Sequence, residues 1–203
     1  MKQARPNIQR FRKRFPEWVF ADISACLRNG VSIGATILCC CAIDYLGRFY
    51  SGDLGQTMNK AKYVDFLRQY FPSTYDPERF YKLVRCGLVH GYDMQRQFVV
   101  VGSQAPWAQS LHMCWDPKHK ATLVNPFALY KDVRQGFGQF VSDLEKDKEL
   151  SRRFALVWSS TPFERPQLSS DWNKFKHMVG PTLAPERVKK RRAQKGTSVT
   201  APL

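Results

Sequence analysis

The sequence predicts a mainly α-helical bundle with a small antiparallel β-hairpin or sheet inserted into it. Three observations support this fold class. Apolar residues recur at helical spacing along most of residues 16–158. The most apolar run, Val31–Ile43, is 13 residues long, which suits a core helix and is too short for a membrane span of about 20 residues. Between about 96 and 125 the apolar period shortens to that of strands separated by turn residues.

The first 15 residues are predicted to form a basic N-terminal arm. Residues 1–14 hold six Lys or Arg and no Asp or Glu. A run of this kind is either a solvated end that keeps the chain soluble or a segment that holds a phosphate backbone without reading its sequence. Both interpretations stay open.

Three helices are expected between the arm and residue 71. Pro16 suits the first turn of the first helix, which Asn29-Gly30 ends. The second helix, 31–50, is apolar around nearly its whole girth, and this predicts a central position in the bundle. The third, Lys60–Phe71, carries one apolar stripe and ends before Pro72.

A fourth helix is expected from Asp76 to Gly91. Asp76 is a good N-cap, Pro77 fits the first helical position and Glu78 puts an acid in the first turn. Gly91 is the expected C-terminal cap. The inward face holds Phe80, Leu83, Val84 and Leu88.

Short strands are expected after this helix, and a long helix follows them. Asn125-Pro126 begins that long helix, and 150–157 either extends it or starts another. The expected elements are strands 97–101, 111–115 and 121–124 and the helix 127–147.

The folded domain is therefore predicted to span 16–158, with a Pro/Ser-rich and basic tail over 159–203. Trp172 and Phe175 could pack back on the domain, and disorder is expected after Gly180.

The charge balance favours an anionic partner. The chain has 32 Lys and Arg against 17 Asp and Glu, a net charge of +15, which indicates nucleic acid first and an acidic membrane surface second. Eleven of those charges lie in residues 1–14 and 186–203. No signal peptide or membrane segment is predicted, and six cysteines in such a chain indicate reduced thiols and a cytoplasmic protein.

Motifs for cofactors and metals are weak or absent. The sequence has no Gly-rich phosphate loop, no C-x-x-C pair and no H-E-x-x-H. His112, Cys114 and His119 could in principle hold zinc, but alternating strand residues explain them better. No cofactor and no metal are expected.

One patterned site stands out, in which Arg85 and His90 lie near the end of the fourth helix. His can give and take a proton near neutral pH, and Arg offers a planar charged fork for phosphate. Asp44, on an otherwise apolar helix, needs a partner, which Arg48 or Arg85 could supply.

These residues resemble the HEPN superfamily (higher eukaryotes and prokaryotes nucleotide-binding), whose signature is R-x(4)-H at the end of a helix in a small bundle. The strings FYKLVRCGLVHGY (80–92) and AIDYLGR (42–48) are similar to those of uncharacterised bacterial HEPN-like proteins. The resemblance covers roughly 16–155 as a pattern, although only the one motif is specific.

The resemblance implies a metal-independent, toxin-like endoribonuclease that works as a homodimer on RNA, with a protein antitoxin or regulator as a further candidate partner. His90 would be the acid or base, Arg85 the ligand of the scissile phosphate and Asp44 the orienting carboxylate. Arg48 would be a supporting cation. Lys82 and Tyr92, which lie within the matching string, are candidate binding residues.

Helix geometry adds a condition. Five residues along a straight α-helix turn by about 140°, so Arg85 and His90 would flank the apolar face instead of sharing one side. The spacing then suits a dimer in which two chains contribute, or a last turn distorted at Gly87. Cys86 also departs from the polar residue common in active members of the superfamily.

Two other functions stay open. The first is a non-catalytic module that binds nucleic acid or a nucleotide in the same groove, with binding that weakens steeply with salt. The second is a protein-interaction domain in which Arg85 and His90 only stabilise the fold.

Overall fold

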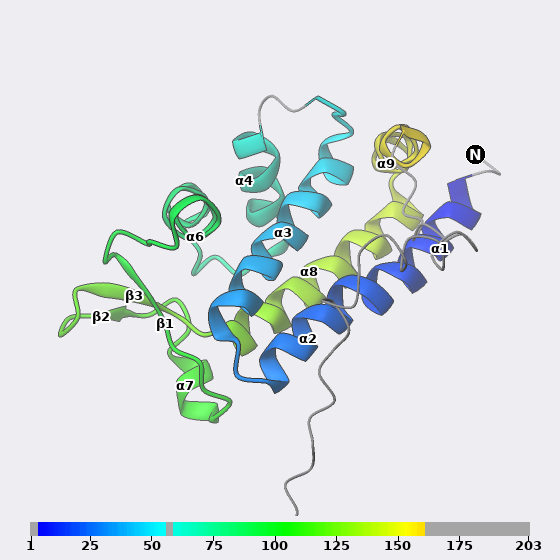
Figure 1. Ribbon diagram of the computed structural model, residues 1–203. Coiled ribbons are helices and arrows are strands. Elements are labelled where there is room, and N and C mark those ends of the chain that lie inside the picture. The colour runs from blue at the N-terminus through cyan, green and yellow to red at the C-terminus, as the bar shows by residue number, and fades with distance from the viewer. Residues whose placement is uncertain (1–3, 56–58, 161–203) are drawn as a thin grey trace, which may run out of the picture. The chain divides into compact units, whose positions relative to one another are not determined.

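The computed structural model describes residues 4–55 and 59–160. Over these residues the protein is mainly helical, with a small three-stranded mixed sheet (Figure 1). The helices are α1 (Ala4–Phe15), α2 (Ala21–Arg28), α3 (Ser32–Ser51), α4 (Asn59–Tyr70), α5 (Pro77–Arg79), α6 (Gly87–Gly91), α7 (Pro106–Ser110), α8 (Pro126–Lys146) and α9 (Lys148–Ser160). The π-helical segments are η1 (Pro16–Phe20) and η2 (Phe80–Cys86), and the strands are β1 (Phe98–Val100), β2 (Trp115–Asp116) and β3 (Ala121–Val124).

The predicted N-terminal arm is wrong for its described part, because residues 4–15 form helix α1 and contribute to the core. Ile8, Phe11 and Phe15 are buried, and α1 lies alongside α8 (Figure 1). The three apolar side chains recur at i, i+3 and i+7, so they share one helical face. The basic run obscured this pattern in the sequence, since Arg10, Arg12 and Lys13 lie between the buried positions and are exposed.

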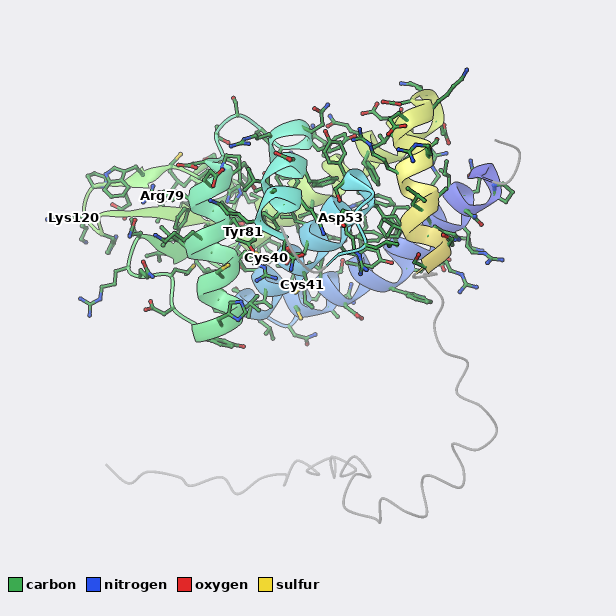
Figure 2. All side chains as sticks on the ribbon, turned by 90° about the horizontal axis from the view of Figure 1, so that it is seen from above. Cys40, Cys41, Asp53, Arg79, Tyr81 and Lys120 are labelled. Carbon is green, nitrogen blue, oxygen red and sulfur yellow. The ribbon has the colours of Figure 1, made fainter. Side chains whose placement is uncertain are left out.

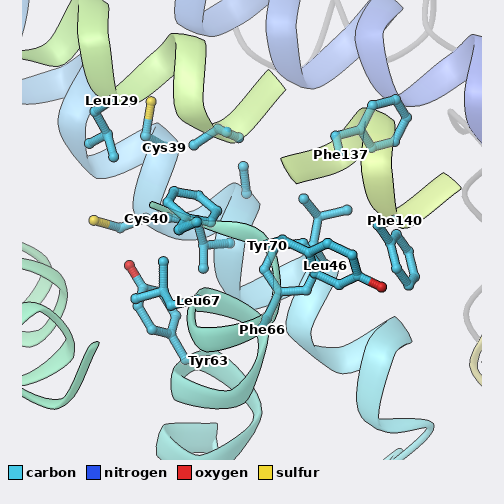
Figure 3. Close-up of a cluster of buried hydrophobic side chains, with 14 of the residues drawn as sticks. Cys39, Cys40, Leu46, Tyr63, Phe66, Leu67, Tyr70, Leu129, Phe137 and Phe140 are labelled. Atoms are coloured by element: carbon cyan, nitrogen blue, oxygen red, sulfur yellow. The ribbon is translucent and has the colours of Figure 1, made fainter. Parts of the chain in front are cut away.

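Helix α3 occupies the centre of the bundle, as its uniform apolarity predicts. It packs against α2, α4, α8 and α9, and Cys39, Cys40 and Leu46 are fully buried (Figure 3). Gly47 permits the closest approach, because a Cβ there would lie 2.6 Å from the carbonyl oxygen of Lys62 on α4. The α3–α4 contact therefore fixes where Lys62 sits.

By length and composition alone, helix α3 is long and apolar enough to cross a membrane. Half of its most apolar window is buried inside the protein. The core helix of a soluble protein has the same length and composition, and α3 packs against helices α2, α4, α8 and α9.

The predicted fourth helix is present but is not a straight α-helix. It runs continuously through α5, η2 and α6, and the Asp76 side chain accepts from the Arg79 amide at 3.1 Å, as an N-cap does. Gly87 is required because a Cβ there would overlap the carbonyl oxygen of Asp93. The left-handed residue that ends the helix is Tyr92, with φ 54°, where Gly91 was expected.

The insertion is a mixed sheet of order β1-β3-β2, so the predicted antiparallel arrangement holds for one pair only. β2 is antiparallel to β3, whereas β1 is parallel to it. The predicted strand 111–115 is wrong over most of its length, because Met113 has φ 62° and leaves the extended conformation. Helix α7 and the turn after it occupy the crossover that a parallel pair requires.

The last two helices are separate. Asn125 caps α8 by accepting from the amides of Phe127 and Ala128. Asp147 accepts from the amides of Glu149 and Leu150 at 2.8 and 3.0 Å and so starts α9 as a new helix. Of the predicted tail, residues 159 and 160 end α9; the expectations for Trp172, Phe175 and the chain after Gly180 lie outside the described residues.

Candidate functional site

Arg85 is anchored to the bundle by Asp44. Its Nε donates to Asp44 Oδ2 at 2.7 Å, and the two side chains are 18% and 23% exposed. The guanidinium also lies 5.5 Å from the centre of the Tyr81 ring. Burial lowers the pKa of Arg85, but the hydrogen bond and charge of Asp44 outweigh it and hold that pKa above its usual value. The predicted partner of Asp44 is thus Arg85.

Arg85 and His90 meet within one chain. Arg85 Nη1 lies 3.3 Å from His90 Nε2. An arginine can only donate, so Nε2 accepts and the imidazole in this contact is neutral, with its proton on Nδ1. The exposed ring of His90 stands in the last turn of α6.

The straight-helix geometry that kept these two side chains apart is wrong. Residues 80–86 are π-helical, with i→i+5 bonding that widens the turn, and the long Arg85 side chain then reaches the residue five positions on. Single π-helical turns of this kind are frequent at functional sites. A dimer is therefore not needed to bring the motif residues together.

A cavity of about 310 Å³ opens beside the Asp44–Arg85 pair, between α3, α4 and η2. Its lining holds three cations and one carboxylate. The lining residues are Cys41, Asp44, Tyr45, Arg48, Asn59, Lys62 and Arg85. Figure 2 labels Cys41 of this lining between Tyr81 of η2 and Asp53.

Lys62 and Arg48 are held in this lining by different partners. Lys62 is 6% exposed, and its Nζ donates to Asp53 Oδ2 at 2.8 Å and to the Gly55 carbonyl at 2.6 Å. That hydrogen bond lowers the pKa of Asp53. Arg48 Nη2 donates to the Leu54 carbonyl at 3.2 Å, while its buried Nε has no hydrogen-bond partner among the described residues.

Cys41 lines the cavity but is not an activated nucleophile. Burial, followed by the nearby Asp44 carboxylate, raises the pKa of its thiol. A reactive cysteine needs the opposite environment, one that lowers the pKa and yields the thiolate. The chemistry of this site therefore falls to Arg85 and His90.

The other two predicted binding residues do not line the cavity. Lys82 is exposed on η2. Tyr92 is 74% exposed, and its left-handed φ of 54° is uncommon for a bulky residue. Both flank the motif on the outer surface of the same helix.

The described residues contain no group of three or more His, Cys, Asp or Glu that could hold a metal ion. The side chains weighed as zinc ligands have other partners. His112 bonds Tyr75 and the Asn125 amide, and His119 is paired with Asp116. Cys114 Sγ lies 3.8 Å from the Ser110 carbonyl.

Sequence reasoning missed Lys62, Asn59 and Tyr81. Lys62 carried a usable signal: it stands one helical turn before Phe66, on the buried face of α4, and a lysine in such a position needs a built partner. Asp44 carries the same signal, since it is a charged residue on an otherwise apolar helix. Asn59 and Tyr81 gave no signal, because both types are ordinary on helix surfaces.

No family model, no curated protein and no solved structure matches this chain. The fold and the site define a mainly helical protein with an anchored Arg–His pair beside a cation-lined cavity. The resemblance to the HEPN superfamily rests on residues 42–48 and 80–92 alone.

Proposed function

We propose that the protein is a HEPN-like, metal-independent endoribonuclease that acts as a homodimer in the cytoplasm. The observation that supports this best is the 3.3 Å contact between Arg85 and His90, with Arg85 anchored by Asp44 at 2.7 Å. A neutral imidazole and a fixed guanidinium side by side are the groups that phosphodiester cleavage requires.

His90 and Arg85 have distinct roles in the reaction. When Arg85 Nη1 turns from His90 to the substrate phosphate, Nε2 of His90 is freed. As a base, this nitrogen removes the proton of the ribose 2′-hydroxyl, and the 2′-oxygen attacks the adjacent phosphorus. The bond from phosphorus to the 5′-oxygen breaks, leaving a 2′,3′-cyclic phosphate and a 5′-hydroxyl. Arg85 binds a non-bridging oxygen and neutralises the charge that develops there; its Nη2 makes no hydrogen bond within the described part of the chain.

A homodimer supplies the second proton-transfer group. The leaving 5′-oxygen needs an acid, and the His90 of a second copy, in its protonated form, would provide the proton across a two-fold axis. An exposed apolar side chain beside the motif supports such a face, since Val89 is 40% exposed. Tyr92 would stack on a base, and Lys82 would contact a backbone phosphate.

The reaction type is tested with one pair of matched strands. The full chain is incubated in EDTA with labelled RNA and with DNA of the same sequence. We expect cleavage of the RNA alone, with 2′,3′-cyclic phosphate ends, because the chemistry needs the 2′-hydroxyl and no metal. Cleavage of both strands, or loss of RNA cleavage in EDTA, contradicts the mechanism.

A second candidate function is a module that binds RNA without cutting it. The observation that favours it is that Asp44 and His90 already occupy Nε and Nη1 of Arg85. This module would bind RNA with an affinity that falls steeply with salt and survives His90→Ala. RNA affinity that is insensitive to salt removes this candidate.

A further inference from the structure

We propose that the cavity lined by Arg48, Lys62 and Arg85 is a second phosphate-binding site, which holds the backbone phosphate next to the scissile one. The binding of phosphate follows from the cavity itself. Its place on the RNA backbone rests on the proposed ribonuclease function.

The charge of the cavity selects an anion. Three cations line it against the single carboxylate of Asp44, and that carboxylate is already paired with Arg85. The remaining pair, Lys62 and Asp53, keeps the ammonium at the cavity wall while Asp53 itself is not part of the lining. Since Arg85 and Lys62 are each paired with one carboxylate, Arg48 leaves the pocket with an excess of positive charge, which is favourable for phosphate.

Within residues 4–55 and 59–160, the side chains of this lining have hydrogen-bond donors without a partner. An ammonium has three donors, and Lys62 uses two of them, on Asp53 and Gly55. A guanidinium has five, and within the described part of the chain Arg48 makes one hydrogen bond, to Leu54. Its Nε is buried without a partner, and such a group in a protein is normally satisfied by water or an ion.

Size and position connect the cavity to the motif. At about 310 Å³ it falls in the range of small-molecule sites, so it holds a phosphate together with part of a sugar. Arg85 belongs to both places, because it lines the cavity and contacts His90. An occupant of the cavity is therefore one arginine side chain away from the phosphate beside His90.

The first test titrates inorganic phosphate into the full chain and measures heat. We expect saturable binding that is at least tenfold weaker in Arg48→Gln than in the wild type. Arg152→Gln is the matched control, since Arg152 is an exposed arginine of α9 paired with Glu149. Absence of binding to the wild type, or equal affinity in Arg48→Gln and the wild type, overturns the site.

Melting curves show whether Arg48→Gln is folded. If it is not, Asn59→Ala takes its place: Asn59 is an exposed residue at the start of α4 that lines the same cavity. We expect it to weaken phosphate binding severalfold. Unchanged affinity in a folded Asn59→Ala overturns the site as well.

The second test asks where the phosphate lies on RNA. A 2′-O-methyl dinucleotide, which cannot be cleaved, is compared with the same dinucleotide carrying one more phosphate at its 5′ or 3′ end. One of the two extra phosphates is expected to tighten binding at least fivefold in the wild type and to have no effect in Arg48→Gln. A gain that persists in Arg48→Gln, or no gain in either protein, overturns the assignment to the RNA backbone. Neither test needs cleavage, so failure of the nuclease proposal stays separate from failure of the phosphate site.

Discussion

At the scale of single residues, the site depends on how Arg85 divides its donors. Nε is committed to Asp44 and Nη1 lies against His90, so the guanidinium is fixed before any ligand arrives. Fixed donors lose little entropy when a phosphate binds. Asp44 acts through Arg85, and it is a positioning residue in this account.

The Asp44–Arg85 pair makes a measurable contribution to stability. Both side chains are mostly buried, so removing either partner leaves a charge short of its hydrogen bond. We expect Asp44→Ala and Arg85→Ala each to lower the free energy of unfolding by about 2 kcal/mol, and the double variant to cost less than their sum. Urea unfolding of the four proteins measures this coupling. A pure protein-interaction role predicts that these variants alter stability and no RNA-directed activity.

A second buried network predicts how stability varies with pH. The Asn125 amide donates to His112 Nδ1 at 3.0 Å, so the ring proton is on Nε2 and is donated to Tyr75 Oη at 2.6 Å. Tyr75 in turn donates to Asp132 at 2.8 Å. Burial lowers the pKa of His112 from 6.5 to about 4, because a charged ring at this buried position would lose its hydration by water.

Between pH 6.5 and 4 the folded state therefore binds fewer protons at His112 than the unfolded state does. The stabilisation is complete above pH 6.5 and is lost as the pH falls toward 4, by up to about 3 kcal/mol. Urea unfolding at pH 7.0 and 4.5 is compared for wild type and His112→Gln. We expect the wild type to lose more stability than the variant over this interval; equal losses contradict the buried neutral imidazole.

At the scale of elements, the sequence predicted the helices whose ends carry strong signals. The start of the fourth helix followed from Asp76 and Pro77, and the central place of α3 followed from its apolar girth. The π-helical turn η2 could not be predicted, because its residues are ordinary helix formers that carry no signal for a widened turn. The parallel pairing of β1 with β3 is likewise a tertiary outcome, which short apolar runs do not encode.

Only part of the candidate site could be predicted from the sequence. Asp44, Arg85 and His90 were found because a charge on an apolar helix and a motif at a helix end are both visible in one dimension. Lys62 joins them only through the close approach of α4 to Gly47. Because the residues that line the cavity come from three separate elements, their spacing in the sequence does not indicate it.

Helix α1 supplies a test of the corrected N-terminal boundary. Phe11 is fully buried and its ring meets those of Phe49, Phe137 and Phe154. Phe11→Ala is expected to lower the free energy of unfolding by about 3–5 kcal/mol. The exposed neighbour Lys13 is the control, and Lys13→Ala should stay within about 0.5 kcal/mol of wild type. If urea unfolding shows only a small effect of Phe11→Ala, residues 4–15 do not contribute to the core, and the prediction of an N-terminal arm holds.

At the scale of the whole molecule, the proposed homodimer places the motif at its two-fold axis. Val89 is 40% exposed on α6, next to His90. Burying it against a second copy contributes through the hydrophobic effect, and a charge there opposes association. Sedimentation equilibrium of the full chain should give a dimer for wild type and a monomer for Val89→Asp.

The control for that measurement is Leu156→Asp. Leu156 has a similar exposure, 45%, but stands on α9, so this variant should remain a dimer. A monomeric wild type, or dissociation by both variants, contradicts a two-fold axis at α6.

The most direct test of the central claim, that Arg85 and His90 form a phosphodiester-cleaving pair, is the initial rate of RNA cleavage in EDTA by His90→Ala relative to wild type. His119→Ala serves as control, since His119 is an exposed histidine of the β2–β3 turn. The account predicts a rate reduced by about 10²–10⁴-fold for His90→Ala and an unchanged rate for His119→Ala. Cleavage by His90→Ala at the wild-type rate would contradict it.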